Sequence, residues 1–446
     1  MRVLYVNHTA HISGGERSLL ELLAGLGRRV RATVATPEGD LSCELRAHGL
    51  PVREIPGTAG SLKAHPLHTP RTAGELARAA WSVRRIADHD GADLVHANSI
   101  RAGIVAVAAA RLGGVPAVVH VRDVLPDGPL TRLTRAMVAA GASAIVGNSA
   151  YTLRRFAEQS TDALLAVAHS AVDLNRLGAA AEMEQREARA GLGIPADRGP
   201  VLGVVAQLTP WKGQDDAVRI AAGLRSAHPG VRLLLAGSAK FVSSSTRHDN
   251  RAFVRRLRAL IEELGLRDRV ALLGERTDVP KILRALDVLL VPSWEEPFGR
   301  AIVEALAVGV PVAATSVGGP REVLRDGVDG LLLPPRHPDA WVAALSQLLS
   351  DPGRLAAMTR EGRARATGFS RAAHADRLLS VYEDVLALPR AERRNGRKPP
   401  GPNGHTAGGF APGPRREAPP RRMVIPARTV PSDRSRAAQR VPFPRL

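Results

Sequence analysis

Cysteine is almost absent from this chain of 446 residues, in which Cys43 stands alone. A single cysteine excludes an intrachain disulfide and any metal site built from several cysteine ligands. Aromatic residues make up only 3% of the chain, yet 44% of it is hydrophobic. That hydrophobic share is typical of a soluble globular protein, and the length is enough for two domains with cores of their own.

Long apolar runs are also missing. No stretch reaches 18 uncharged apolar residues, so we predict no membrane-spanning helix. The first 15 residues have a short apolar run and no small-residue cleavage site, so we expect no signal peptide. The expectation is a cytoplasmic protein, with peripheral contact at the inner face of the membrane as a further expectation.

Positive charge is unevenly distributed. The net charge is +19, and residues 390–446 carry 14 Lys or Arg against 3 Asp or Glu. From residue 389 the chain is rich in Pro, Gly and Arg without periodicity, a composition that cannot bury a core, so we predict a disordered tail over 389–446. Such a tail is either inert or contacts an anionic membrane; nucleic acid is not an expected partner.

The first half of the sequence alternates between apolar strands and amphipathic helices. We predict strands over 2–8, 30–36, 52–55, 93–98, 116–121, 144–148 and 163–168, with helices over 17–26, 73–89, 100–112, 131–140 and 151–158. This alternation predicts an α/β fold with a doubly wound parallel sheet.

The second half repeats the alternation. Predicted strands cover 201–206, 231–236, 270–273, 287–293, 310–315 and 330–333, and predicted helices cover 215–227, 252–264, 279–286, 300–308, 338–349, 353–366 and 370–388. We therefore expect an N-terminal domain over 1–175, a linker over 176–199, a second domain over 200–370, a C-terminal helix over 371–388 that returns to the first domain, and the tail.

The stretch from 287 to 319 carries two acids at an informative spacing. Glu296 follows a buried strand, at the edge where open α/β sheets bind ligands. Glu304 lies about one turn into an otherwise apolar helix, where an unpaired carboxylate is unfavourable. Both acids facing a polyol ligand is one interpretation. An Arg300–Glu304 pair within the helix, with Glu296 solvated, is an equally good one.

Other candidate site residues follow strands of the first half. Gly14 and Gly15 come between a strand and a helix, an arrangement that suits a phosphate but equally a tight turn. His120 and Asp123 mark the end of another predicted strand. The loops 57–70 and 122–131, which follow two of the predicted strands, are expected to influence which ligand binds.

The segment EEPFGRAIVEAL, followed by VGGPREVLRDGVDGLLLPP, resembles the signature of retaining glycosyltransferase family 4. Gly14-Gly15, His120 and Trp211-Lys212-Gly213 support the resemblance, which covers about residues 1–388. It implies two Rossmann-like domains facing a cleft, the B-type glycosyltransferase fold. The implied reaction moves a hexose from a nucleotide diphosphate sugar to a glycan, lipid-linked or small alcohol acceptor in polysaccharide or glycoconjugate biosynthesis.

The resemblance also implies roles for individual residues. Catalytic roles fall to Glu296, His120 and Lys212, and substrate contacts to Gly14, Gly15, Gln207, Arg276, Thr277, Phe298, Gly299, Arg300 and Glu304. Glu304 would hold the ribose, Glu296 the donor sugar, and Lys212 the diphosphate, whereas His120 would face the reacting centre. The acceptor would attack from the leaving-group side, and neither a cofactor nor a metal ion is expected.

One position departs from the family pattern. Many relatives carry an Arg in the loop before Lys212, where this chain has Gln207. The diphosphate thereby loses a fixed positive charge, and Arg17, Arg300 and Arg321 are candidates to replace it. Two other functions are compatible with the sequence: a nucleotide-sugar epimerase on the same fold, and a non-catalytic protein that binds anionic surfaces through its tail.

Overall fold

The computed structural model describes residues 1–57, 69–158, 161–195, 199–240 and 248–388. All of these belong to one compact unit. The tail predicted over 389–446 lies outside the described residues, as does most of the loop expected over 57–70.

The first sheet is formed by seven strands among the described residues. They are β1 (Arg2–Val6), β2 (Arg31–Thr36), β3 (Val52–Glu54), β4 (Leu94–Ala97), β5 (Ala117–Val121), β6 (Ala144–Gly147) and β7 (Leu164–Val167). Their helices are α1 (Gly14–Leu26), α2 (Asp40–Ala47), α3 (Thr69–Asp90), α4 (Ile100–Gly113), α5 (Pro129–Gly141) and α6 (Ala150–Ala157), with a 3₁₀ turn, η1 (Gly27–Arg29). We call these elements the N-lobe.

A second sheet follows. Its strands are β8 (Val201–Val205), β9 (Arg232–Ala236), β10 (Val270–Gly274), β11 (Val288–Val291), β12 (Val312–Thr315) and β13 (Leu331–Leu333). Its helices are α7 (Leu174–Glu182), α8 (Gln185–Ala190), α9 (Gln214–Leu224), α10 (Asn250–Glu263), α11 (Val279–Ala285), α12 (Arg300–Val308), α13 (Pro320–Val323), α14 (Pro338–Leu349) and α15 (Pro352–Ala366), with 3₁₀ turns η2 (Pro210–Lys212) and η3 (Thr367–Phe369). We call these the C-lobe. The last helix is α16 (Arg371–Ala387).

Both sheets are parallel and doubly wound, as predicted. The strand order is β3-β2-β1-β4-β5-β6-β7 in the first and β10-β9-β8-β11-β12-β13 in the second. Central strands such as β4 and β11 are buried along their whole length, as expected for parallel strands covered by helices on both faces. In each sheet the winding reverses at the first strand, between β1 and β4 and between β8 and β11. Parallel sheets bind ligands beyond the carboxyl ends of the strands at such a reversal.

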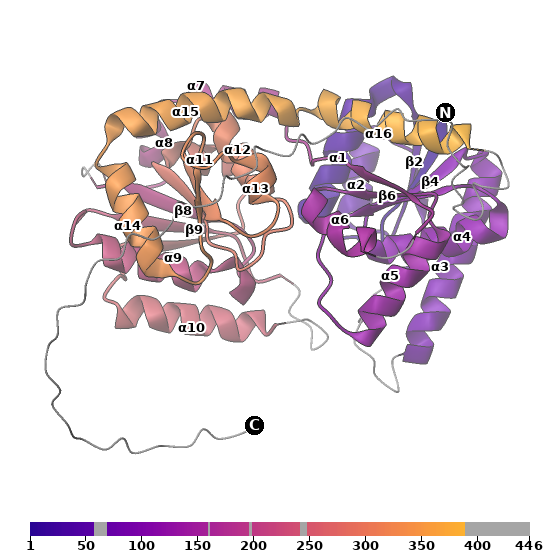
Figure 1. Cartoon of the computed structure of the whole chain (residues 1–446), viewed down its shortest axis with the longest axis horizontal. Coiled ribbons are helices and arrows are strands. Elements are labelled where there is room, and N and C mark those ends of the chain that lie inside the picture. Colours follow the sequence, from indigo (N-terminus) through magenta and orange to yellow (C-terminus); the bar gives the residue numbers. More distant parts are fainter. Residues whose placement is uncertain (58–68, 159–160, 196–198, 241–247, 389–446) are drawn as a thin grey trace, which may run out of the picture. The chain divides into compact units, whose positions relative to one another are not determined.

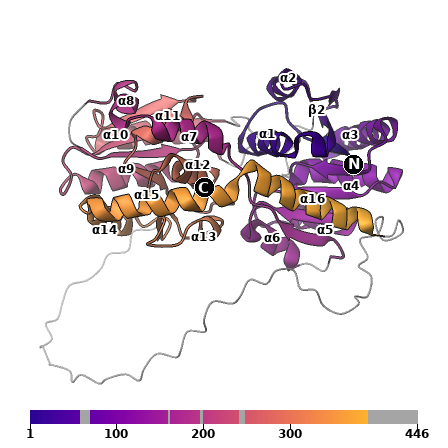
Figure 2. The same cartoon turned by 90° about the horizontal axis from the view of Figure 1, so that it is seen from above.

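Helix α16 returns to the N-lobe, where it lies along α1 (Figures 1 and 2). Its Leu378 and Tyr382 are buried in the same apolar cluster as Leu19 and Leu22 of α1. The two helices approach so closely that a Cβ on Gly25 would stand 2.5 Å from the carbonyl oxygen of Arg371. The domain limits predicted from the sequence remain a prediction.

The sequence did not predict three local features. Helix α1 begins at Gly14 rather than residue 17, because Ser13 and Glu16 form a capping box in which the Ser13 N–H donates to the Glu16 carboxylate. The segment 176–199, expected as a linker, contains α8 and most of α7, which pack on α11 and α12. Helix α2, which the sequence pattern did not predict, buries Leu41 and Leu45.

Candidate functional site

A cavity of about 1300 Å³ opens where the carboxyl ends of the two sheets meet. Its walls are the loops that follow β1, β4 and β5 in the N-lobe, and β8, β9, β10 and β11 in the C-lobe. All but one of the twelve residues predicted for the site line this cavity. They are Gly14, Gly15, Gln207, Lys212, Arg276, Thr277, Glu296, Phe298, Gly299, Arg300 and Glu304.

Lys212 and Glu296 form an ion pair in the cavity wall. The Lys212 ammonium donates to the Glu296 carboxylate across 2.6 Å, and the Ser293 hydroxyl donates to the same oxygen at 2.9 Å. Lys212 also lies 4.1 Å from the ring centre of Trp211. The side chains of Lys212 and Glu296 are only 16% and 8% exposed, so the pair is largely desolvated. Without a ligand, the two charges neutralise each other.

The Gly-Gly pair after β12 fixes the position of Glu296. Gly319 donates its N–H to the Glu296 carbonyl at 2.8 Å, and Glu296 donates its own to the Val317 carbonyl. Gly318 adopts a φ of +96°, and a Cβ there would stand 2.1 Å from the Glu296 carbonyl oxygen. Only glycine allows both the left-handed backbone and this close approach. These two glycines therefore act as a buttress for the acid.

A second glycine contact fixes Lys212. Gly213 has a φ of +68°, and a Cβ at this position would stand 2.2 Å from the carbonyl oxygen of Pro292. The loops after β8 and β11 can therefore touch only because residue 213 is glycine. The Trp294 N–H donates to the Trp211 carbonyl at 2.8 Å and joins the same two loops. Lys212 and Glu296 are thus held together by backbone contacts as well as by their charges.

Glu304 is paired with Arg300, as the second of the two sequence interpretations predicted. The Arg300 guanidinium donates to Glu304 at 2.8 Å, one turn along α12, and lies 3.6 Å from Glu21 of α1 in the N-lobe. The side chains of Arg300 and Glu304 are both less than one-fifth exposed. One Arg300 nitrogen, Nη1, is buried without a hydrogen-bond partner among the described residues. Both acids, Glu296 and Glu304, nevertheless line the cavity. The Arg300–Glu304 pair of the second interpretation is present, but its solvated Glu296 is wrong, because this carboxylate is buried and paired with Lys212.

Phe298 and Gly299 lead into α12. Gly299 is its N-cap with a φ of +92°, and a Cβ there would collide with Ile302. The first N–H groups of a helix have no carbonyl partner within that helix, and here they begin at the cavity. Phe298 is buried and stacks on His169, with ring centres 5.7 Å apart. The helix terminus therefore presents N–H donors and a favourable dipole end to an anion.

The other C-lobe residues predicted for the site have partners of their own. Arg276 donates twice to Asp278, at 2.8 and 2.7 Å, and the Thr277 carbonyl accepts from Arg176 at 2.9 Å. Gln207 carries no charge and donates its side-chain N–H to the carbonyl of Lys240 at 3.2 Å.

In the N-lobe, Gly14 and Gly15 form the first turn of α1. A Cβ on Gly14 would meet nothing within 4 Å, and one on Gly15 would only touch the Arg122 side chain at 3.7 Å. Packing against the described residues therefore requires neither glycine. Beneath them, the buried Arg122 donates to Asn98 and Ser170.

His120 does not join the others. It is fully buried and does not line the cavity. Its Nδ1 accepts from Arg122 at 3.3 Å, and its ring lies against those of His96 and His374. Burial first, and then the charge of Arg122, hold the pKa of His120 well below its usual value. The placement does not fit the expectation that His120 faces the reacting centre, because the side chain points toward α16 instead.

Asp123 takes the place at the cavity wall expected for His120. Asp123 is an exposed residue of the cavity wall, and desolvation by the surrounding protein raises the pKa of its carboxylate. The negative charge of Glu16 raises it further, while Lys212 opposes the change. Across the N-lobe wall, burial lowers the pKa of His8 to about 4, and its ring lies 3.0 Å from the Ser99 hydroxyl.

The two lobes are also joined beside the cavity. Glu322 of α13 accepts from the N–H groups of Ala150 and Tyr151, at the start of α6, and lies 3.0 Å from His169. Burial acts to raise the pKa of Glu322, but these hydrogen bonds outweigh it and lower that pKa. The Ser149 hydroxyl donates to the Pro297 carbonyl, next to Phe298. The edge of the N-lobe is thus bonded to the loop that carries Glu296.

In the described part of the chain, no three or more His, Cys, Asp or Glu side chains gather in a way that could hold a metal ion. None of its helices combines the length and apolarity needed to span a bilayer.

Sequence reasoning missed several cavity residues. Glu16 could have been found, because Ser13-x-x-Glu16 is a capping-box pattern. For Asp123 the sequence leaves two roles open, a contact to the acceptor or a pair in the neighbourhood of Arg122. Lys240 had no local signal, because its role depends on where the loop after β9 folds.

Two family profiles match successive parts of the chain. Residues 12–176 match "Glycosyltransferase Family 4", and residues 184–365 match "Glycosyl transferases group 1". Among curated relatives, the D-inositol 3-phosphate glycosyltransferase of Mycolicibacterium paratuberculosis is 31% identical over 389 residues, covering 82% of this chain and 79% of that protein. The enzyme of the same name from Mycobacterium tuberculosis is 32% identical over 392 residues, covering 82% and 72%.

Solved structures agree on the fold. Anabaena Alr3699/HepE, crystallised with UDP-glucose, is 26% identical, with a TM-score of 0.73 over 86% of this chain and all of that one. Sucrose-phosphate synthase from Thermosynechococcus elongatus is 21% identical, with a TM-score of 0.70 over 86% of this chain and 99% of its own. The latter likeness shows the fold alone. The prediction of two Rossmann-like domains facing a cleft is confirmed.

Proposed function

Because this chain belongs to the group 1 glycosyltransferases, we propose that it transfers a hexose, with retention of anomeric configuration, from a nucleotide diphosphate sugar to a hydroxyl acceptor. The observation that carries the proposal is the Lys212–Glu296 pair beside the N-terminus of α12. This wall brings together a cation for the leaving phosphate, an acceptor for sugar hydroxyls and the N–H donors at the N-terminus of α12.

The donor lies along the C-lobe wall in this proposal. Glu304 accepts from the ribose hydroxyls, Glu296 from the hydroxyls of the hexose, and the N–H groups of Phe298 and Gly299 donate to sugar or phosphate oxygens. Arg276 and Thr277 lie beside the base. UDP-glucose is the first donor to test, because HepE was crystallised with it at 26% identity.

The acceptor occupies the N-lobe side. Gly14 and Gly15 leave room for it, since an added Cβ at Gly14 would point into open space. Asp123 replaces His120 as the polar group nearest the reacting centre, because it lines the cavity and His120 does not. The related proteins named D-inositol 3-phosphate glycosyltransferases make a polyol phosphate the first acceptor to test, ahead of glycans and lipid-linked sugars.

The chemistry needs charge stabilisation more than a nucleophilic side chain. The acceptor oxygen forms a bond to C1 of the hexose as the bond from C1 to the diphosphate oxygen breaks. The acceptor proton passes to that phosphate oxygen, on the same face, so the configuration is retained. Negative charge grows on the diphosphate, where Lys212 and the α12 N-terminus stabilise it electrostatically.

We expect no metal ion to be needed for this transfer. Measuring transferase activity in excess EDTA tests that expectation.

The direct test mixes the protein with UDP-glucose, first alone and then with D-inositol 3-phosphate or a glycan panel. The expected results are slow UDP release without acceptor, faster release with one, and a product whose anomeric proton coupling matches the donor. Lys212→Met is the inactive control. A protein that neither binds nor consumes any common nucleotide sugar would refute the proposal, and an isomerised nucleotide sugar in the sample without acceptor would point to an epimerase instead.

Contact with an anionic membrane through residues 390–446 is a separate part of the proposal, supported by the excess of basic residues there. Pelleting with phosphatidylserine vesicles tests it directly. We expect the full chain to pellet and a chain ending at residue 389 to remain in solution at equal transferase activity. Equal pelleting of both chains would remove the membrane role.

A further inference from the structure

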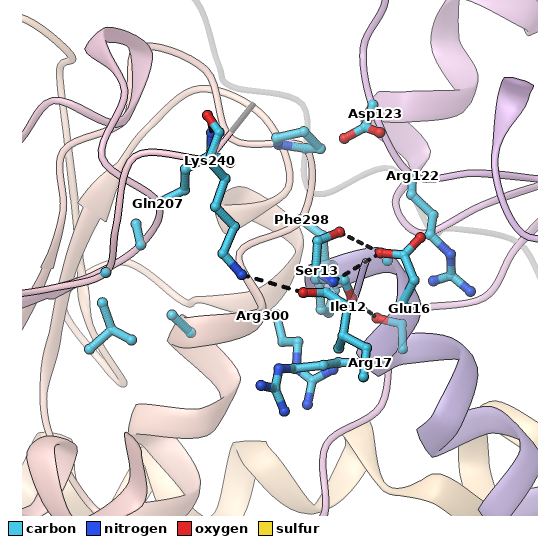
Figure 3. Close-up of a pocket in the computed structure, with 18 of the residues that line it drawn as sticks. Ile12, Ser13, Glu16, Arg17, Arg122, Asp123, Gln207, Lys240, Phe298 and Arg300 are labelled. Atoms are coloured by element: carbon cyan, nitrogen blue, oxygen red, sulfur yellow. Dashed lines mark hydrogen bonds between the residues drawn. The ribbon is translucent and has the colours of Figure 1, made fainter. Parts of the chain in front are cut away.

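Lys240 reaches across the cavity from one lobe to the other. It follows β9, and its ammonium lies 2.6 Å from the Glu275 carboxylate and 3.4 Å from the carbonyl oxygen of Ile12 in the N-lobe. Figure 3 shows the side chain extended toward Ile12, beside the Ser13–Glu16 turn. The charged end of Lys240 therefore lies next to the N-lobe loop that leads into Gly14 and Gly15.

The backbone of Lys240 is fixed by two amide side chains. Gln207 donates to its carbonyl at 3.2 Å and Asn250 at 2.7 Å. Gln207 is itself held, because its carbonyl accepts from Gln214 at 2.8 Å. The loop after β8 contains both Gln207 and Lys212. Through Gln207, this loop is hydrogen-bonded directly to the backbone of Lys240.

Strand order places the loop that carries Lys240 beside the loop that carries Lys212. Strands β9, β8 and β11 are neighbours in the sheet, and the loops at their carboxyl ends carry Lys240, Lys212 and Glu296 in that order. Gly237 lets the first two loops touch, because a Cβ there would stand 1.9 Å from the Ala206 carbonyl oxygen. A diphosphate held by Lys212 thus has Glu296 on one side and Lys240 on the other.

The cations of the C-lobe wall differ in how firmly they are paired. Arg276 donates two hydrogen bonds to Asp278, and Arg300 lies between two acids, Glu304 and Glu21. Among the residues that the structure describes, Lys240 has one acidic partner, Glu275, whose side chain is 57% exposed. An exposed pair contributes little stability, so exchanging Glu275 for a phosphate is the least unfavourable of these exchanges.

We propose that Lys240 is a second diphosphate-binding cation of the donor site, which supplies the charge that Gln207 lacks, while Gln207 positions it. This inference rests on the proposed function. On donor binding, Lys240 exchanges Glu275 for a phosphate oxygen and keeps its approach to the Ile12 carbonyl. It thereby binds the leaving group and brings the Gly14–Gly15 loop over it.

The test compares nucleotides that differ in phosphate content. Affinities for UDP-glucose, UDP, UMP and uridine are measured by calorimetry for the wild type, Lys240→Met, Lys240→Arg and the control Lys281→Met. Lys281 lies on α11, does not line the cavity and carries the same charge. Circular dichroism and thermal unfolding establish that each variant folds.

We expect Lys240→Met to weaken UDP and UDP-glucose roughly 10- to 100-fold, the loss of a charge-assisted hydrogen bond, and to leave uridine unchanged. Lys240→Arg should restore most of the affinity, and Lys281→Met should match the wild type. The dependence of UDP affinity on salt should also become weaker in Lys240→Met.

Two results would overturn the inference while leaving the proposed function intact. One is unchanged UDP affinity in Lys240→Met. The other is an equal loss for uridine and UDP, which would make Lys240 a structural support of the loop. If the wild type binds none of the four nucleotides, the proposed function itself fails and the inference fails with it.

Discussion

The Lys212 ammonium and the Glu296 carboxylate lie 2.6 Å apart in the wall of the cavity, and each neutralises the other. A ligand that carries both phosphate and hydroxyl groups can satisfy the two residues separately. Phosphate would take the place of Glu296 at Lys212, and sugar hydroxyls would take the place of Lys212 at Glu296. The pair therefore couples recognition of the sugar to recognition of the diphosphate.

Glu296→Gln should separate these two functions. The variant keeps the shape of the side chain but loses its charge, so hexose transfer should fall roughly 100- to 1000-fold, as for loss of one transition-state stabiliser. UDP affinity should stay equal or increase, because Lys212 no longer has an acidic partner. Steady-state kinetics and UDP calorimetry check both, with Lys212→Met as the comparison that loses UDP affinity. Loss of UDP binding in Glu296→Gln would contradict this account.

Glu304 and Arg300 allow a test of the two interpretations that the sequence left open. If Glu304 binds ribose, Glu304→Ala should weaken UDP about 10- to 100-fold, since a hydrogen bond to a charged group is lost. Affinity for inorganic pyrophosphate, which has no ribose, should be unchanged.

A double-mutant cycle with Arg300→Ala then isolates the contribution of the ion pair to stability. If Glu304 serves only as the partner of Arg300, UDP and pyrophosphate affinities will change together in Glu304→Ala. The loss would also disappear when the same substitution is made in an Arg300→Ala background.

Gly318→Ala should disable the site without touching a ligand. The added Cβ would stand 2.1 Å from the Glu296 carbonyl oxygen, on a backbone with a φ of +96°. We expect a loss of about 1–3 kcal/mol in the free energy of unfolding, together with a large fall in transfer rate, because Glu296 must move. Gly178→Ala in α7 is the control, because its Cβ would meet nothing within 4 Å. Wild-type activity in Gly318→Ala would show that Glu296 does not need this buttress.

Much of this architecture is readable from local sequence. Helix α12 spans residues 300–308, as predicted. The prediction was possible because the segment is apolar on nearly all sides and a glycine stands at each end. The loops after the strands could be assigned to one edge of each sheet, because the carboxyl ends of parallel strands all lie at the same edge. Helix α2 was missed because only Leu41 and Leu45 mark its buried face, too few for a clear period.

His120 shows why a strand-end position alone does not identify a cavity residue. Side chains alternate between the two faces of a strand. His120 shares its face with Val118, which packs in the cluster that includes α1 and α16, whereas Val119 and Val121 pack on the opposite face. The cavity lies beyond the strand, so Asp123 reaches it and His120 does not. Lys240 likewise could not be predicted, because its contact to Ile12 joins residues 228 positions apart.

His374 should make the protein sensitive to acid. Burial, reinforced by the charge of Arg122, lowers the pKa of His374 to about 3, against an ordinary value of 6.5. Between these values the unfolded chain binds a proton that the folded protein does not, so stability falls as the pH falls. From pH 7 to pH 5 this one group should remove about 2 kcal/mol from the free energy of unfolding. Above pH 7 its contribution should be constant.

Urea unfolding of His374→Leu at pH 5 and pH 7 measures that contribution. The variant should lose about 2 kcal/mol less than the wild type between the two pH values, since leucine cannot take up a proton in the unfolded chain. His96 and His120 are buried beside it with lowered pKa values, so some acid sensitivity should remain in the variant. The exposed His48, replaced by Gln, is the control. If His374→Leu and the wild type lose equal stability, His374 is protonated in the folded protein or accessible to water, and the buried neutral ring inferred here is wrong.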